Sequence, residues 1–404
     1  MRSERAVIGL VGAVQFVNIL DFMMVMPLGP DFAVSLGVPM DQLGVVGGAY
    51  TLAAGISGLA LSPILDRADR RVALAVCMAG LAIGTALGGF ATDLTTLVAA
   101  RVVAGAFGGP ATSVAMSIVA DVIPVERRGR ALGAVMGAFS VASVFGVPAG
   151  LWLAQLLNWR TPFFAVAAAG ALIAGGAIVL LPSLRGHLDG RGVEGGVARL
   201  LGQRVAWSAL AATSAITLSA FIVIPNLSSF IQFNLLWPRE GLGSLYMAGG
   251  VLSFVGLRLF GPLADRFGSL ALVIAGSLAF ALVGVAWWMM SPPPVPVWVL
   301  FPAMMLAMSA RNVAHQSLLS KVAEAGDRAA FQSLNSATQH LTSAVAAFLG
   351  TILLTTAPGG ALVGMPHVAW VALIAAAAGP LFLAHVQQSV GGGQARPEQK
   401  ASTG

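Results

Sequence analysis

Two similar stretches decide the fold: GLALSPILDRADRRVAL, residues 58–74, and GLRLFGPLADRFGSLAL, residues 256–272. Three positions are identical at a spacing of 199 residues: Pro63 and Pro262, Asp66 and Asp265, Arg67 and Arg266. A weaker echo, 200 residues apart, relates ERRGRALG (126–133) to GDRAAFQS (326–333). Because this spacing is about half of the 404 residues, the sequence predicts two halves of the same orientation.

The composition indicates a membrane protein. Apolar residues make up 57% of the chain and charged residues 9%, against roughly 25% charged in an ordinary soluble domain. An apolar helix needs about 20 residues to cross a bilayer. Apolar runs between charged or Pro/Gly clusters predict twelve such helices, which begin near Ala6, Gly44, Val72, Leu94, Ala131, Pro162, Val205, Leu242, Leu270, Val295, Ala329 and Pro366. We therefore expect an all-α membrane protein with two six-helix bundles.

One polar stretch divides these spans into two groups. Residues 183–204 are the only interior segment too charged to lie in lipid. The expected division is a bundle over residues 1–182, a cytoplasmic linker over 183–204, a second bundle over 205–390 and a disordered tail over 391–404.

The basic residues predict the orientation in the membrane. Seventeen of the 22 Lys and Arg fall in segments on the same side as the N-terminus, two on the opposite side and three within spans. Short cytoplasmic segments collect Lys and Arg, so both termini are expected to be cytoplasmic. The same scatter explains the net charge of +6 without a nucleic-acid partner.

Motifs for other functions are missing from the sequence. The single cysteine, Cys77, and five scattered His without an HExxH pattern offer no metal site. No GxxxxGKS phosphate loop and no recognisable Ser/His/Asp arrangement is present. We expect neither an enzyme nor an ATP-driven pump, and no cofactor. A membrane-embedded sensor is disfavoured because no soluble domain is attached.

Asp21 is the only acidic side chain well inside an apolar run, where a carboxylate is costly and usually functional. It lies roughly 22 Å from the inner surface and so roughly 8 Å from the outer one. Arg101 lies about 10 Å from the outer surface. Burial disfavours a charged carboxylate and a nearby arginine favours it, so movement between the two can release or take up a proton. We predict Asp21 as proton acceptor and Arg101 as its partner; the alternative is a static ion pair.

Several motifs resemble the major facilitator superfamily over nearly the whole chain. They are the paired loop motif, LVAARVVAGAFGG (97–109) and GVPAGLWLAQLLNWRTPFF (146–164). The last of these and LDFMMVMPLGPDF (20–32) are similar to the twelve-helix drug:proton and sugar-efflux antiporters. The first loop copy differs from the family motif because Ser62 and Asp69 occupy glycine positions.

The resemblance implies a transporter in the bacterial cytoplasmic membrane, with a site between the two bundles. It implies a cytoplasmic gate built from Asp66, Arg67, Arg70, Asp121, Arg128, Asp265 and Arg266. It also implies an antiporter-type helix motif, here reduced to Gly146, Pro148 and Gly150. The alternative for the charged loop residues is topology alone.

Polar residues inside the spans are candidates for the substrate cavity. They are Gln15, Asn18, Asn226, Gln232, Arg311, Asn335, Gln339 and His340. Such groups bind a polar substrate or simply join helices by hydrogen bonds, and singly the second is commoner.

The leading hypothesis is therefore a monomeric secondary transporter that exports a small organic compound or drug by alternating access, driven by the proton gradient. Its partners would be the substrate, protons and the lipid bilayer. The alternative is a proton-coupled importer or a uniporter for a small polar nutrient.

Overall fold

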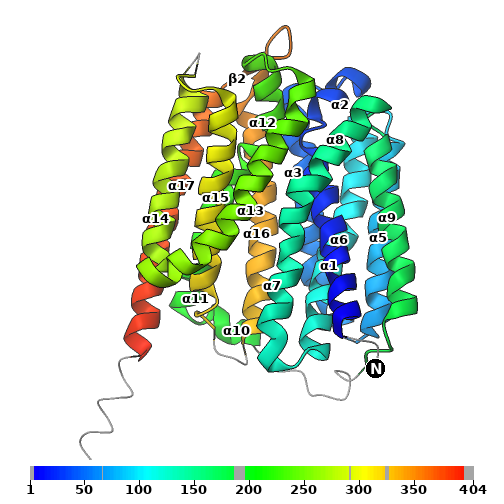
Figure 1. Ribbon diagram of the computed structural model, residues 1–404, viewed down its shortest axis with the longest axis vertical. Coiled ribbons are helices and arrows are strands. Elements are labelled where there is room, and N and C mark those ends of the chain that lie inside the picture. The colour runs from blue at the N-terminus through cyan, green and yellow to red at the C-terminus, as the bar shows by residue number, and fades with distance from the viewer. Residues whose placement is uncertain (1–3, 66, 186–195, 291–292, 324–326, 395–404) are drawn as a thin grey trace, which may run out of the picture.

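Long apolar runs become helices here because a helix satisfies every backbone hydrogen bond within one segment, which a bilayer requires. The computed structural model describes residues 4–65, 67–185, 196–290, 293–323 and 327–394. In these ranges the protein is a bundle of long helices that run side by side along its longest axis (Figure 1). The predicted fold class, an α-helical membrane protein, is confirmed.

The helices of the first half are α1 (Glu4–Val25), α2 (Gly29–Leu36), α3 (Leu43–Ala60), α4 (Ser62–Leu65), α5 (Arg70–Gly89), α6 (Leu94–Val122), α7 (Val125–Val141), α8 (Val147–Leu156) and α9 (Thr161–Leu180). The short 3-10 helix η1 (Met40–Gln42) precedes α3, and the π-helical turn η2 (Ala142–Gly146) joins α7 to α8.

The remaining helices are α10 (Gly196–Leu201), α11 (Arg204–Phe221), α12 (Ile224–Ser229), α13 (Leu242–Phe267), α14 (Ser269–Gly284), α15 (Val297–Leu319), α16 (Arg328–Leu353) and α17 (Met365–Gln394). The π-helical turns η4 (Phe230–Asn234) and η6 (Val285–Met289) extend α12 and α14, and the 3-10 helix η5 (Arg239–Gly241) precedes α13. The strands β1 (Thr355–Thr356) and β2 (Leu362–Val363) form a small antiparallel hairpin before α17.

Every predicted span corresponds to a helix, although the count of clear membrane spans differs. Eleven segments of the described chain are long and apolar enough to cross a membrane. The helix that is not among them is α16, whose polar side chains, Gln339 and His340 among them, reduce its mean hydropathy. The last helix reaches Gln394, into the tail that was expected to be disordered from residue 391.

The helices pack in two sets that follow the order of the chain. In the first set α6 packs on α3 and α5, and α9 packs on α5 and α1. In the second set α15 packs on α13 and α14, and α17 packs on α11 and α14. The sets meet where α16 packs along α3 and where α13 packs against η2 and α8. Figure 1 shows the first set, in blue to teal, beside the second, in green to red.

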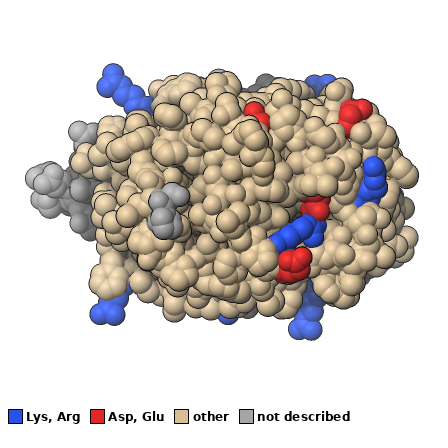
Figure 2. All heavy atoms as spheres, turned by 90° about the horizontal axis from the view of Figure 1, so that it is seen from above, with Lys and Arg blue, Asp and Glu red and all other residues tan. Residues whose placement is uncertain are grey.

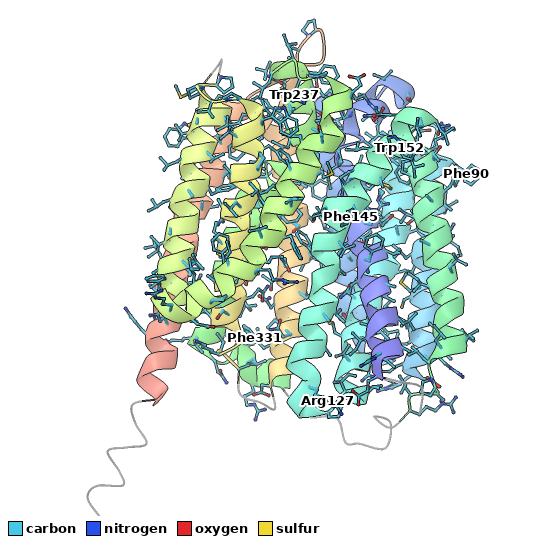
Figure 3. All side chains as sticks on the ribbon, in the orientation of Figure 1. Phe90, Arg127, Phe145, Trp152, Trp237 and Phe331 are labelled. Atoms are coloured by element: carbon cyan, nitrogen blue, oxygen red, sulfur yellow. The ribbon has the colours of Figure 1, made fainter. Side chains whose placement is uncertain are left out.

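Large apolar side chains are exposed on the flanks of the bundle. Phe90, Phe145 and Trp152 are 69%, 67% and 59% exposed and are labelled in Figure 3. An exposed apolar surface of this extent is unfavourable in water and is what a lipid environment requires. Seen from the end that carries α2 and the β hairpin, the surface has few charged side chains (Figure 2).

Candidate functional site

A buried ion pair lies between α1 and α6. Asp21 is 0% exposed and Arg101 is 1% exposed. The Arg101 guanidinium donates from Nη1 to Asp21 Oδ1 at 3.1 Å and from Nη2 to Asp21 Oδ2 at 2.5 Å. This two-pronged geometry is the strongest that an arginine makes with a carboxylate. The two residues that the sequence singled out are therefore in direct contact.

Two further side chains complete this site. Thr85 on α5 donates from Oγ1 to Asp21 Oδ1 at 2.7 Å. The Arg101 guanidinium lies over the ring of Tyr50 on α3, 4.7 Å from its centre, a favourable cation–π contact. Four helices thus converge on one ion pair. The sequence reasoning missed Thr85 and Tyr50; the available signal was a polar side chain in an apolar span, and Tyr50 is one of two tyrosines in the chain.

Glycines allow these helices to approach each other closely. A Cβ at Gly105 would lie 2.2 Å from the Tyr50 carbonyl oxygen, and one at Gly84 would lie 2.4 Å from the Ala104 backbone nitrogen. A side chain at either position would force α3 or α5 away from α6. The glycines of the GAFGG segment (105–109) therefore allow α3 to pack close to α6, which keeps Tyr50 beside Arg101.

The amides of α1 lie on the same side as Asp21 and bond to neighbouring helices. Asn18 donates from Nδ2 to the Gly108 carbonyl at 2.6 Å and to Thr112 Oγ1 at 3.0 Å, and it accepts from Tyr50 Oη at 2.6 Å. Thr112 in turn donates to Gln15 Oε1 at 3.3 Å. Tyr50 thus connects this amide row to the ion pair, because its ring contacts Arg101 and its hydroxyl contacts Asn18.

The second half has a polar cluster between α11, α15 and α16. Thr213 on α11 donates from Oγ1 to Asn335 Oδ1 at 2.6 Å and lies 3.1 Å from His315 Nε2. Arg311, one helical turn from His315, is 1% exposed and donates from Nη2 to Ser219 Oγ at 2.5 Å.

The other predicted cavity residues occupy varied positions. Asn226 on α12 is 0% exposed, and its amide has no hydrogen-bond partner among the described residues. Gln232 is half-buried and lies 3.5 Å from the Ser228 carbonyl. On α16, Gln339 is exposed, and the His340 Cβ lies close to Gly55 of α3. In the described part of the chain, no hydrogen bond or ion pair joins any of these four residues to Asp21.

The antiporter-type motif lies where the two sets of helices meet. Gly146 ends the π-helical turn η2, and Pro148 lies in the first turn of α8. A Cβ at Gly146 would lie 2.8 Å from the Leu20 side chain of α1. Across the two sets, a Cβ at Gly250 of α13 would lie 2.9 Å from the backbone of Ser143. A π-helical turn often marks a functional site, and this one contacts both halves.

The structure describes only some residues of the predicted cytoplasmic gate. Arg70 donates from Nε to Asp121 Oδ2 at 2.5 Å, which joins the foot of α5 to the foot of α6. Asp265 and Arg266 are exposed near the end of α13, as is Arg67 in the loop before α5. Asp66 and the side chain of Arg128 lie outside the described residues.

Asp69, at a glycine position of the loop motif, binds the start of the linker. It caps α5 by accepting from the Arg71 N–H, and it also accepts from Ser183 Oγ at 2.5 Å, the Leu184 N–H at 3.1 Å and Arg185 Nε at 3.3 Å. Burial raises the pKa of Asp69, but these hydrogen bonds outweigh it and lower the pKa to about 2. The local sequence pattern does not identify Ser183, Leu184 and Arg185 as the partners of Asp69.

Polar contacts join the two halves at the end of the bundle that carries α2 and the β hairpin. Arg239 donates from Nη2 to Asp31 Oδ1 at 2.5 Å, and Thr356 donates to Asp41 Oδ1 at 2.5 Å. Burial raises the pKa of Asp31, and the hydrogen bond and charge of Arg239 offset this only partly. In this structure the two halves are therefore closed against each other at that end.

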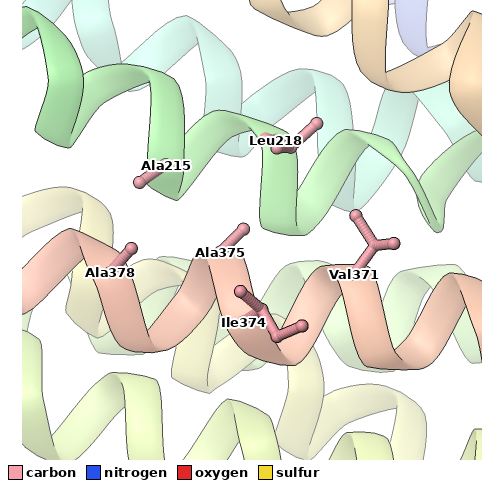
Figure 4. A pocket seen from close by; sticks show the side chains of 6 residues that line it. All are labelled: Ala215, Leu218, Val371, Ile374, Ala375 and Ala378. Carbon is pink, nitrogen blue, oxygen red and sulfur yellow. The ribbon is translucent and has the colours of Figure 1, made fainter.

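Two pockets are open to the side of the second half. One, of about 430 Å³, lies between α11 and α17, and its labelled side chains are all apolar (Figure 4). The other, of about 630 Å³, lies between α11 and α16, where Ser214, Thr338 and Thr342 add hydroxyl groups. Neither pocket is lined by a charged residue, so neither contains the ion pair.

Comparison with known proteins gives one family. The Major Facilitator Superfamily model matches residues 11–307. The chain is 29% identical over 264 residues to a "Chloramphenicol resistance protein" of Streptomyces lividans, covering 63% of this chain and 66% of that protein. It is 26% identical over 309 residues to the "Purine ribonucleoside efflux pump NepI" of Salmonella paratyphi A, covering 67% of this chain and 74% of that pump. It spans 42% of the length of another relative, YtbD of Bacillus subtilis.

Solved structures have the same fold. A bacterial homolog of the human lysosomal transporter Spinster, in an inward-facing and unoccupied conformation, matches with a TM-score of 0.74 at 15% identity, covering 96% of this chain and 98% of that one. A D-xylose-proton symporter matches with a TM-score of 0.73 at 17% identity, covering 94% and 97%. At these identities the likeness concerns the fold alone.

Proposed function

The chain belongs to the Major Facilitator Superfamily, whose members are membrane transporters of small molecules, and on that premise we propose that it exports a small organic compound in exchange for protons. The observation that carries the proposal is the buried pair of Asp21 and Arg101. A carboxylate within a span is rare and usually serves a proton or a ligand. The curated relatives include efflux proteins, which supports export as the direction.

The proposed coupling uses the contacts around Asp21. While Arg101 and Thr85 donate to the carboxylate, its charged form is stabilised. A relative shift of α1 and α6 would remove these donors and leave a buried carboxylate that takes up a proton. Proton binding and the exchange between outward-open and inward-open conformations would then depend on each other. Asp21 is the proton acceptor in this scheme, and Arg101 is its positioning partner.

The surroundings of the transporter are part of the same proposal. We place it in a bacterial cytoplasmic membrane as a monomer, with both termini cytoplasmic and no cofactor. The excess of Lys and Arg on the N-terminal side supports this orientation. Cys77 is the single cysteine of the chain and is buried, so a Cys77→Ala variant has none. A cysteine added to this variant at residue 2 or at residue 404 would then report the side of that terminus by labelling in intact cells.

The direct test measures uptake into inside-out proteoliposomes under an imposed pH gradient. The panel contains dyes, drugs, chloramphenicol and purine ribonucleosides. Wild type is compared with Asp21→Asn, and Asp93→Asn is the matched control, since Asp93 is an exposed helix cap and Asn caps a helix equally well. We expect Asp21→Asn to lose gradient-driven uptake and to retain substrate binding.

The same assay separates the alternatives. Flux that does not depend on the gradient and that Asp21→Asn leaves unchanged would indicate a facilitator with a structural ion pair. Expression that raises cellular accumulation of a compound would indicate an importer. Either result would contradict proton-driven export.

A further inference from the structure

Arg311 is a buried arginine whose charge is not compensated by a described carboxylate. Its Nη2 donates to Ser219 Oγ at 2.5 Å and lies 3.4 Å from the Ile216 carbonyl. Its Nε and Nη1 have no hydrogen-bond partner among the described residues. The guanidinium lies over the ring of Phe280, 4.6 Å from its centre. A buried charge without a counter-ion is costly, so this position is complete only when a negative group is present.

The two buried arginines can be compared through the positions of their partners. Ser219 on α11 lies 198 residues after Asp21, within one residue of the spacing of the repeated Pro, Asp and Arg. Arg101 and Arg311 are 210 residues apart but occupy comparable helices. Each is a buried arginine on the fourth span of its half, and each donates to the first span. The partner of the arginine is a carboxylate in the first half and a serine hydroxyl in the second.

The sequence of the second half offers no replacement. Between residues 205 and 394 its acidic residues are Glu240, Asp265, Glu324 and Asp327. Glu240 and Asp265 lie at or near the ends of α13, and Asp327 lies directly before α16. None belongs to the middle of a span.

Further polar side chains lie near Arg311, but none of them is a carboxylate. His315 is 3% exposed and lies one turn further along α15. Its Nε2 lies 3.1 Å from the Thr213 hydroxyl, which is also 2.6 Å from Asn335 Oδ1. Arg311 thus has no carboxylate beside it in the described part of the chain, whereas Asp21 pairs with Arg101 in the first half.

We propose that Arg311 binds a singly charged anionic group, carried by the exported compound or supplied by an inorganic anion such as chloride. This inference rests on the proposed function only where it concerns the exported compound. The anion would accept hydrogen bonds from Arg311 Nε and Nη1, beside the Ser219 hydroxyl. The transporter would then prefer compounds with an acidic group over their neutral analogues.

The test measures anion-dependent thermal stability of the purified full chain in detergent. The reference salt is sodium gluconate, whose anion is bulky. It is replaced by sodium chloride or sodium benzoate at constant ionic strength, and neutral benzamide is tested as the uncharged analogue of benzoate. We expect the melting temperature of wild type to rise saturably with at least one of the two anions. Loss of charged hydrogen bonds should weaken the apparent affinity roughly tenfold or more in Arg311→Met.

A second variant, Ser219→Asp, tests the proposal even if Arg311→Met fails to fold. Ser219→Asp would supply the missing carboxylate from within the protein, so it should raise the melting temperature in gluconate and abolish the anion response. Arg258→Met is the matched control, because Arg258 is exposed and lies over Phe254. This control should retain the full response.

The outcomes separate the two sources of the anion. A response to benzoate that exceeds the response to chloride, with none to benzamide, assigns the anion to the compound. A response to chloride that equals or exceeds the response to benzoate assigns it to an inorganic anion. No response in wild type, or the same response in Arg311→Met, would overturn the proposal. Because this assay needs no gradient, a failure of proton-driven transport would leave its result unchanged.

Discussion

The two halves solve the same problem of a buried arginine differently. In the first half Arg101 donates twice to Asp21, and Thr85 donates to the same carboxylate. In the second half Arg311 donates to the hydroxyl of Ser219, and two of its nitrogens have no partner among the described residues. The two halves thus contain one buried ion pair, Arg101 with Asp21, and one buried arginine, Arg311, without a described counter-ion. In the functions proposed above, the halves have separate tasks: proton coupling in the first and recognition of a negative group in the second.

The largest expected effect is a difference in stability between two matched variants. Arg101→Met leaves Asp21 buried without its counter-ion, which we expect to cost about 3–5 kcal/mol. Arg311→Met removes a buried charge without a described counter-ion and should be neutral or stabilising in gluconate buffer. Thermal unfolding of both variants in detergent checks this expectation. Equal losses would mean that Arg311 has a strong partner after all.

A double variant sharpens the same comparison. Asp21→Asn combined with Arg101→Met removes both charges, so it should recover much of the stability that Arg101→Met loses, because paired buried charges are strongly non-additive. Additive losses would contradict the assignment of the cost to the unpaired carboxylate.

The next effect concerns the contact between the halves. Burial raises the pKa of Asp31 despite Arg239, so the carboxylate is the costly member of this pair. Arg239→Leu should destabilise the closed end by about 1.5–3 kcal/mol, whereas Asp31→Asn should cost much less. Labelling of a cysteine introduced near this end reports how often it opens. A larger opening in Asp31→Asn than in Arg239→Leu would reverse our ranking.

The sign of the pH effect follows from the same shift. An opened end would hydrate Asp31 and return its pKa toward the usual 3.8, so the closed state binds the proton more tightly. Closure should therefore be strongest below pH 3.8, weaken as the pH rises through the raised pKa of Asp31, and stay constant at higher pH. Asp31→Asn, which cannot titrate, should remove this dependence.

A smaller effect is expected at the linker. The pKa of Asp69 is lowered to about 2, so its stabilising contribution is fully present above the ordinary value of 3.8 and is lost as the pH falls toward 2. Asp69→Ala should cost about 1–2 kcal/mol through the lost helix cap. Limited proteolysis should then cut near residues 183–185 more rapidly. Asp93→Ala, which removes the cap of α6 at an exposed position, should leave that cleavage unchanged.

Asp21 and Arg101 could be paired from the sequence because the constant rise of a helix gives the depth of each residue. Depth does not give the direction in which a side chain points, so the contacts of Tyr50, Thr85 and Ser219 with the two arginines and Asp21 did not follow from it. Their positions depend on how closely the helices pack, for example at Gly105, where α3 touches α6. The bond from Ser183 to Asp69 joins residues 114 positions apart, and no local pattern announces such a contact.

The last prediction compares the two copies of the loop motif through substitutions at Gly268 of the second copy. Asp69 has φ −60°, which suits any residue, whereas Gly268 at the matching position has φ +87°. No heavy atom lies within 4 Å of an added Cβ at Gly268, so the cost of Gly268→Ala is backbone strain alone, roughly 1–3 kcal/mol. Gly268→Asp should lose the same amount and gain no anchor, since the conformation differs from that of Asp69. Thermal unfolding of both variants checks this, and a stabilising Gly268→Asp would show that the copies share more local geometry than their backbone angles indicate.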